Sequence, residues 1–185
     1  MKNRIFIILV HTALMTLFVA HRVNAQEYVP DSTLSGKIIL CNPTTTIFSL
    51  GDISSQINKE LAIPCITIGN GEELAELSFF PGDVANSICR VKIFKNDIIK
   101  PRVLVPWCFY TEGGIRLGMS LNDVISKKGP PDNKTCNCCG KTVRVVYRLD
   151  SGSSFLKRYN MPLYSQVFIF DNDYLSTIEY GFEYP

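Results

Sequence analysis

Histidine is scarce in this chain. Only two occur among 185 residues, His11 and His21, and both lie in the N-terminal 25 residues. The rest of the chain therefore cannot form a Ser-His-Asp or Cys-His nucleophilic site, or a histidine-ligated metal site. Phosphate-binding loops, nucleophile elbows and dinucleotide-binding fingerprints are absent as well. The sequence predicts a protein that is not an enzyme and needs no cofactor.

Long apolar runs are also scarce. The one candidate spans residues 5–20, follows the basic residues Lys2 and Arg4, and is followed by small residues before Gln26. This pattern is typical of a secretory signal peptide over residues 1–25, and the run is short for a bilayer span of about 20 residues. We expect a secreted or periplasmic protein with no membrane span after cleavage; an uncleaved anchor is the alternative.

An excess of one charge is missing once the signal is removed. The full chain has 19 basic and 17 acidic side chains, and residues 1–25 hold three of the basic ones and no acid. The mature chain then carries 16 basic against 17 acidic groups, a net charge of −1. Nucleic acid binding depends on clustered positive charge, so we expect no nucleic acid partner.

Cysteine, by contrast, is abundant. The seven cysteines are Cys41, Cys65, Cys89, Cys108, Cys136, Cys138 and Cys139. Exported proteins meet an oxidising compartment, so disulfides are expected, and an odd number leaves at least one thiol free or paired between chains. The spacing does not determine connectivity. Two hypotheses are that Cys108 pairs with a member of the 136–139 loop and that Cys41 pairs with Cys65.

The 136–139 loop has a second interpretation. Cys136, Cys138 and Cys139 could bind a soft metal ion as thiolates, with a fourth ligand from elsewhere. Cys136 and Cys139 also have the spacing of a redox pair, although such pairs usually sit at a helix N-terminus. The alternative function is therefore a metal-active or redox-active envelope protein.

Two segments of the chain echo each other. Leu50-Gly51 and Leu117-Gly118 are each followed by a helical pattern, ending at Pro64 and at Pro131. In the first, Ile53, Ile57 and Leu61 recur at a spacing of four; in the second, Ser120 and Asp123 form a capping pair. We interpret the echo as two tandem units over residues 37–104 and 105–185, after a flexible mature N-terminus over residues 26–36.

Strand patterns surround both expected helices. They cover residues 37–40, 44–50, 65–68, 74–80, 88–94, 103–110, 143–149, 155–159, 166–170 and 175–184. The last of them alternates apolar and polar residues, which is typical of a half-buried strand. The predicted fold class is α+β, with a short helix packed on an antiparallel sheet in each unit.

The stretch Gly114-Ile115-Arg116-Leu117-Gly118-Met119-Ser120, with Val124 and Gly129-Pro130, resembles the signature of the SmpA/BamE-like superfamily. The segment from Phe170 to Ile178 is similar to the tail of that pattern. With the weaker first copy, the chain resembles the tandem arrangement of the β-lactamase inhibitor protein family. The resemblance implies a binding or assembly protein that presents a sheet surface to a partner.

The sequence thus predicts an exported, non-catalytic protein-binding scaffold: an inhibitor, an immunity-type protein or an envelope-assembly adaptor. Its partner would be another protein, bound by the solvent face of the sheet and by loops near residues 132–142 and 159–165. Tyr159 and Tyr164 are the candidate contact residues, because aromatic side chains are favoured as interface anchors.

Overall fold

The computed structural model describes residues 28–58, 60–80, 87–97, 99–137 and 140–183. Strands hold 41% of the structure and helices 15%, so the protein is mainly β rather than α+β. The described helices are α2 (Pro43–Leu50), α3 (Leu121–Lys128) and α4 (Ser154–Tyr159). The described strands are β1 (Thr33–Leu34), β2 (Ile38–Ile39), β3 (Cys65–Gly69), β4 (Glu73–Phe79), β5 (Ile88–Lys95), β6 (Val103–Leu104), β7 (Asn133–Cys136), β8 (Thr142–Leu149), β9 (Leu163–Asp171) and β10 (Tyr174–Glu183).

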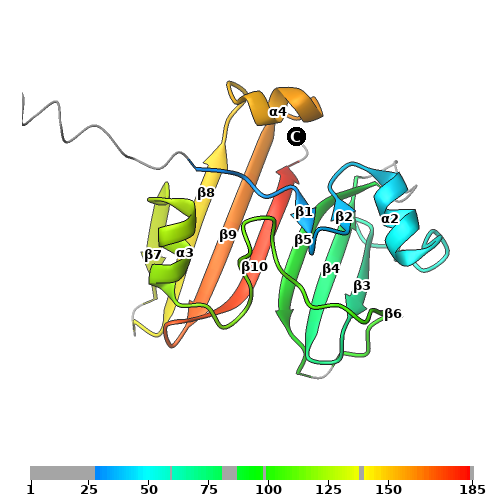
Figure 1. The fold of residues 1–185 in the computed structure, drawn as a ribbon, viewed down its shortest axis with the longest axis horizontal. Coiled ribbons are helices and arrows are strands. Elements are labelled where there is room, and N and C mark those ends of the chain that lie inside the picture. The colour runs from blue at the N-terminus through cyan, green and yellow to red at the C-terminus, as the bar shows by residue number, and fades with distance from the viewer. Residues whose placement is uncertain (1–27, 59, 81–86, 98, 138–139, 184–185) are drawn as a thin grey trace, which may run out of the picture.

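Eight of these strands form one mixed sheet, in the order β6-β3-β4-β5-β10-β9-β8-β7 (Figure 1). Only the β3–β6 pair is parallel. The two predicted units meet inside this sheet, because β5 pairs with β10 over five residues, from Phe94 opposite Thr177 to Arg90 opposite Gly181. The predicted arrangement of two tandem helix-on-sheet units is therefore wrong. The pattern of residues within each strand does not indicate that the edge strands of the two predicted units will pair.

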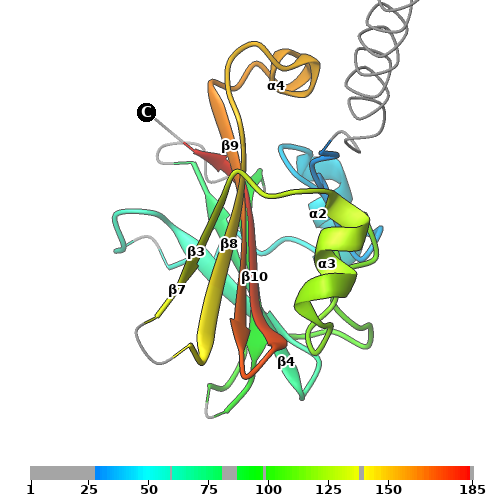
Figure 2. The same cartoon turned by 90° about the vertical axis from the view of Figure 1, so that its left-hand side faces the viewer.

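The core lies on one face of the sheet. Figure 2 shows α2 and α3 on the same side, and Leu156 of α4 and Val124 of α3 belong to a single buried cluster with the sheet residues. The predicted alternation along the last strand is seen in β10, where Ile178, Tyr180 and Phe182 are buried in this cluster. The opposite face of the sheet has no described helix over it.

Helix α3 has the ends that the sequence predicts. The Ser120 hydroxyl accepts a hydrogen bond from the Asp123 backbone amide at 3.2 Å, and the Asp123 carboxylate accepts one from the Ser120 amide. These contacts satisfy amide groups that a helix N-terminus leaves without partners. Lys127 and Lys128 lie in the last turn, and Gly129 follows with φ +80°. Local sequence signals are sufficient for this element.

Helix α2 occupies a segment that the sequence predicts as a strand. Asn42 caps it by accepting from the Thr45 amide, Pro43 stands at the first turn, and Gly51 ends it with φ +75°. β-Branched residues favour strands, but a capping Asn followed by Pro is a strong helix-start signal. The capping residues therefore determine that this segment is a helix and not a strand.

The helix predicted after Gly51 is wrong. Residues 54–56 form a turn and no helix; Ile53 and Ile57 on either side are buried as predicted, while Leu61 is 48% exposed. The Asp52 carboxylate accepts from the Ser54 amide, a local contact that competes with helix formation. Gly51 ends a helix, whereas Gly118 precedes one, so the two Leu-Gly segments are not structural equivalents.

Three other segments differ from the prediction. Residues 154–159 form α4 instead of a strand, because Ser153 caps a helix that ends at Asn160 in a left-handed conformation. The predicted strand over residues 103–110 is reduced to β6. Edge strand β7 was not predicted, and its four residues are all exposed. Exposed edges lack the apolar alternation that identifies a strand.

The segment predicted as a flexible mature N-terminus, residues 26–36, is not loose over its described part, residues 28–36. Asp31, Leu34 and Ser35 are buried there, and Leu34 is part of the core cluster. The predicted signal peptide, residues 1–25, lies outside the described residues. No helix within the described ranges is long and apolar enough to cross a membrane.

Candidate functional site

The uncovered face of the sheet carries alternating charges across three central strands. Glu76 of β4 lies opposite Lys92 of β5, and Lys92 lies opposite Glu179 of β10. Arg90, two residues from Lys92, makes an ion pair with Glu179 at 3.2 Å, with each side chain 31% exposed. A pair exposed to this degree contributes about 0–1 kcal/mol to stability. Such charges mainly affect the specificity for a binding partner and the rate of association.

A hollow of about 550 Å³ opens beside these charges. Its apolar lining consists of Leu61, Ile63, Phe79, Phe80, Cys89 and Phe182. Its charged lining consists of Glu76, Arg90, Lys92, Glu179 and Glu183. Binding sites commonly combine an apolar floor with a few placed polar groups, and this volume is within their usual range. We define this hollow and the adjoining charges of β4, β5 and β10 as the open-face site.

Two thiols line the hollow but are poor nucleophiles. Burial raises the pKa of Cys89 to about 11, and its Sγ donates to the Ser78 carbonyl oxygen at 3.3 Å. Burial, and then the nearby Glu76 carboxylate, also raises the pKa of Cys65. Since the thiolate is the reactive form, the surroundings of both side chains disfavour redox or covalent chemistry.

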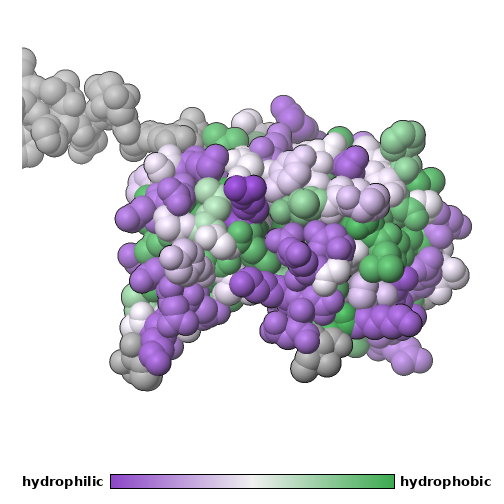
Figure 3. Space-filling view, turned by 60° about the horizontal axis from the view of Figure 1, so that its bottom comes forward, coloured by the Kyte–Doolittle hydropathy of each residue, from purple (hydrophilic) through white to green (hydrophobic). Residues whose placement is uncertain are grey.

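Exposed apolar side chains gather at one end of the molecule. Figure 3 shows hydrophobic surface on the side of α2, β3 and β6. The large exposed residues from this half of the chain are Ile47, Phe48, Leu61, Ile63, Ile99 and Leu104, with Phe48 91% exposed. Leu61 and Ile63 also line the hollow, so the apolar end continues into the open-face site. Exposed apolar patches are typical of interaction surfaces.

The predicted cysteine pairs are not formed among the described residues. Cys65, Cys89, Cys108 and Cys136 carry no disulfide, and no two described cysteines lie at bonding distance. Cys138 and Cys139 lie outside the described residues, so disulfide stapling by the 136–139 loop stays a prediction. Cys136 is exposed at the end of β7. Within the described ranges, no group of three His, Cys, Asp or Glu side chains could hold a metal ion.

The two predicted contact tyrosines have different surroundings. Tyr164 is buried, with 1% of its surface exposed, and its hydroxyl donates to the Asp31 carbonyl oxygen at 2.7 Å. It is therefore a core residue and not a surface contact. Tyr159 is half-buried, and its ring packs on those of Phe155 and Phe182. The two-residue periodicity of β9 could have indicated that Tyr164 is buried, because it lies on the same face of the strand as the buried residues Gln166, Phe168 and Phe170.

Four tyrosines make folding sensitive to alkali. Burial raises the pKa of Tyr147 to about 12, and burial is also the main cause that raises the pKa values of Tyr28, Tyr164 and Tyr180. In the unfolded chain a tyrosine titrates near pH 10. Above that pH the unfolded chain releases phenol protons that the folded chain retains, so stability is complete below pH 10 and falls as the pH rises.

We expect unfolding at high pH, with a loss of roughly 1.4 kcal/mol per pH unit for each fully buried phenol, Tyr164 and Tyr180. Circular dichroism and phenolate absorbance followed together would check this, because these phenols should ionise only as structure is lost. Tyr174→Phe, which removes a 63% exposed phenol, should leave the unfolding pH unchanged. Ionisation of all tyrosines before any loss of structure would contradict the prediction.

Comparison with family models, with curated proteins and with solved structures finds no match to this chain. The resemblance to the SmpA/BamE-like superfamily therefore stays a hypothesis. The fold and the site define a mainly β protein, with helices α2 and α3 on one face of the sheet and none of the described helices on the other.

Proposed function

We propose that this protein is an exported, non-catalytic scaffold that binds another protein through the open-face site. The observation that carries the proposal is the hollow of about 550 Å³ on the uncovered sheet face, lined by apolar side chains and bordered by alternating charges. An apolar side chain of the partner would fill the hollow, as anchors do at the centre of interfaces. The Glu76, Lys92 and Glu179 charges would select a partner with complementary charges.

Two further observations support a binding role. The exposed residues Leu61 and Ile63 extend the hollow toward the apolar end, which enlarges the surface that a partner could cover. The thiols beside the hollow have raised pKa values and are therefore poor nucleophiles. This property supports a surface that a partner covers more than it supports a site of covalent chemistry. The other described cysteines contribute no nucleophile to this site, because they do not line it.

The test is a matched pair of variants used to capture partners from the exported fraction. Ile63→Asp places a charge at the rim of the hollow, whereas Val29→Asp places one at an exposed apolar residue that lies outside both the hollow and the apolar end; the two side chains are 51% and 65% exposed. We expect Ile63→Asp to weaken binding of the captured protein about tenfold or more and Val29→Asp to leave it unchanged.

A charge reversal gives an independent measurement. Lys92→Glu reverses the charge of a lysine that lines the hollow, and we expect slower association and a changed dependence of binding on salt. Lys157→Glu on the exposed side of α4 is the control. Equal binding by the wild type, Ile63→Asp and Lys92→Glu would exclude the open face as the contact surface.

A further inference from the structure

The N-terminal segment 28–33 is held mainly by side chains of the rest of the protein. Residues 28–32 belong to no strand, yet side chains donate hydrogen bonds to three carbonyl oxygens of the segment, while the Leu40 amide donates to the carbonyl oxygen of Ser32 and Thr33 pairs with Ile39. The contacts are Lys128 Nζ to Val29 O at 2.6 Å, Tyr164 Oη to Asp31 O at 2.7 Å, and Tyr180 Oη to Thr33 O at 2.8 Å. A sheet strand is instead held by its neighbour's backbone.

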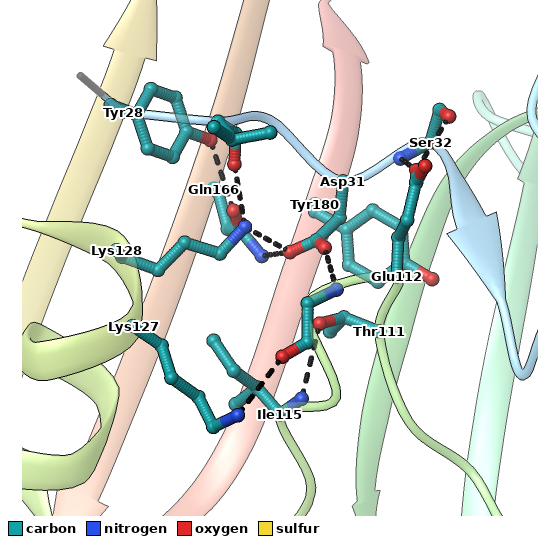
Figure 4. Close-up of polar contacts among 12 residues, drawn as sticks. Tyr28, Asp31, Ser32, Thr111, Glu112, Ile115, Lys127, Lys128, Gln166 and Tyr180 are labelled. Atoms are coloured by element: carbon teal, nitrogen blue, oxygen red, sulfur yellow. Dashed lines mark hydrogen bonds and ion pairs between the residues drawn. The ribbon is translucent and has the colours of Figure 1, made fainter. Parts of the chain in front are cut away.

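At the centre of the segment, the Asp31 carboxylate receives three donors. Lys128 Nζ and Gln166 Nε2 each lie 2.6 Å from Oδ2, and the Gly113 amide donates to Oδ1 at 2.6 Å (Figure 4). Asp31, Lys128 and Gln166 are all buried, with 3% exposure or less. Charge-assisted hydrogen bonds are stronger than those between neutral groups. A site that places three donors around one side chain therefore favours a carboxylate over an amide.

The first residue of the segment has its own contact surface. The Tyr28 ring stacks on Tyr147 with centroids 4.8 Å apart, and its hydroxyl donates to Gln166 Oε1 at 2.9 Å. Val29, the next residue, is 65% exposed, so it contacts the rest of the protein through its carbonyl oxygen and not through its side chain. The segment therefore shows the division expected of a bound peptide: buried side chains at some positions and free ones between them.

The donors belong to elements that the rest of the chain builds. Lys128 ends the capped helix α3, Gln166 and Tyr164 lie in β9, and Tyr180 lies in β10. The segment connects to this body through a turn in which Gly36 and Lys37 are exposed. Segment and receptor groove are thus separate in the sequence except at one exposed turn.

We propose that the groove between α3, the loop containing Gly113 and strands β9 and β10 is a peptide-binding site for an extended segment with a central aspartate. The chain's own segment 28–33 is its tethered ligand. The site is distinct from the open-face site, because its residues lie on the helix-covered face of the sheet.

The experiment separates ligand from receptor in the folded protein. A recognition sequence for a site-specific protease is inserted between Gly36 and Lys37, and the full chain is cut after folding. A labelled peptide of residues 28–36 is then added, and its exchange into the cut protein is followed by fluorescence anisotropy. We expect the cut protein to stay folded and the peptide to replace the original segment.

Peptide variants test the chemistry of the site. The Asp31→Asn peptide should bind about 30-fold more weakly or worse, because one partner of a buried charge pair is lost. The Val29→Ala peptide is the matched control and should bind within about threefold of the original. Unfolding on cleavage would overturn the proposal, because the segment would then be part of the folding core. Failure of the peptide to exchange, or equal binding of the Asn peptide, would overturn it as well.

Discussion

Replacing Lys128 by Met should lower the free energy of unfolding by about 3–5 kcal/mol. Met retains most of the aliphatic packing of the lysine stem but leaves the Asp31 carboxylate buried without a cation. The cost of burying an unpaired charge exceeds the loss of the pair itself, because water cannot reach the carboxylate. Two of the three donors to Asp31, Gln166 and the Gly113 amide, would remain. Chemical denaturation of both proteins measures the difference.

Two further variants show whether the charge is the cause. Arg90→Met breaks the exposed pair with Glu179 and should cost about 0–1 kcal/mol. Combining Asp31→Asn with Lys128→Met removes both buried charges, so the double variant should lose at least about 1 kcal/mol less than the sum of the single variants. A Lys128→Met protein as stable as the wild type would show that the ion pair is not needed for folding.

Replacing Gly181 by Ala should lower the free energy of unfolding by about 3 kcal/mol. Gly181 has φ +152°, a conformation that side chains disfavour, and it lies where β10 meets β5. An added Cβ would lie 2.4 Å from the Cys89 carbonyl oxygen and 2.5 Å from the Arg90 Cα. Both neighbours are backbone atoms, so relief requires the two strands to move apart. Thermal and chemical unfolding would measure the loss.

Gly152→Ala is the control for this substitution. Gly152 is exposed, and its added Cβ would meet only the Asp150 carboxylate oxygen, at 3.4 Å. Surface substitutions of this type change stability by about 0.5 kcal/mol or less. If Gly181→Ala behaved like Gly152→Ala, the close approach of β5 and β10 would not be required for the single sheet.

The elements predicted well share one property: their signals lie within a few residues of sequence. The Ser120 and Asp123 capping pair places the start of α3, and the Gly129-Pro130 dipeptide places its end. The alternation from Ile178 to Phe182 identifies the buried face of β10. Errors occurred where two local signals competed. In residues 43–50 the β-branched side chains favoured a strand, but the segment forms helix α2 because Asn42 and Pro43 stabilise its N-terminus.

The candidate sites depend on contacts between residues far apart in the chain. Glu76 and Glu179 come together with Lys92 only because β5 lies between β4 and β10. Asp31 and Lys128 are separated by 97 positions, and both look like ordinary surface charges in the sequence. Their pairing requires the N-terminal segment to cross β9 and β10, which no spacing rule indicates.

By itself, the sequence determined the helix α3 and most of the strands, because caps and periodicity are local properties. Only the tertiary structure decided that β5 and β10 join all the strands from β3 to β10 into one sheet, that the described helices leave one face of the sheet uncovered, and that Asp31 of the N-terminal segment is buried beside Lys128. These outcomes depend on which edges and grooves are complementary in space. Complementarity of that kind is a property of the folded chain and not of any short stretch of it.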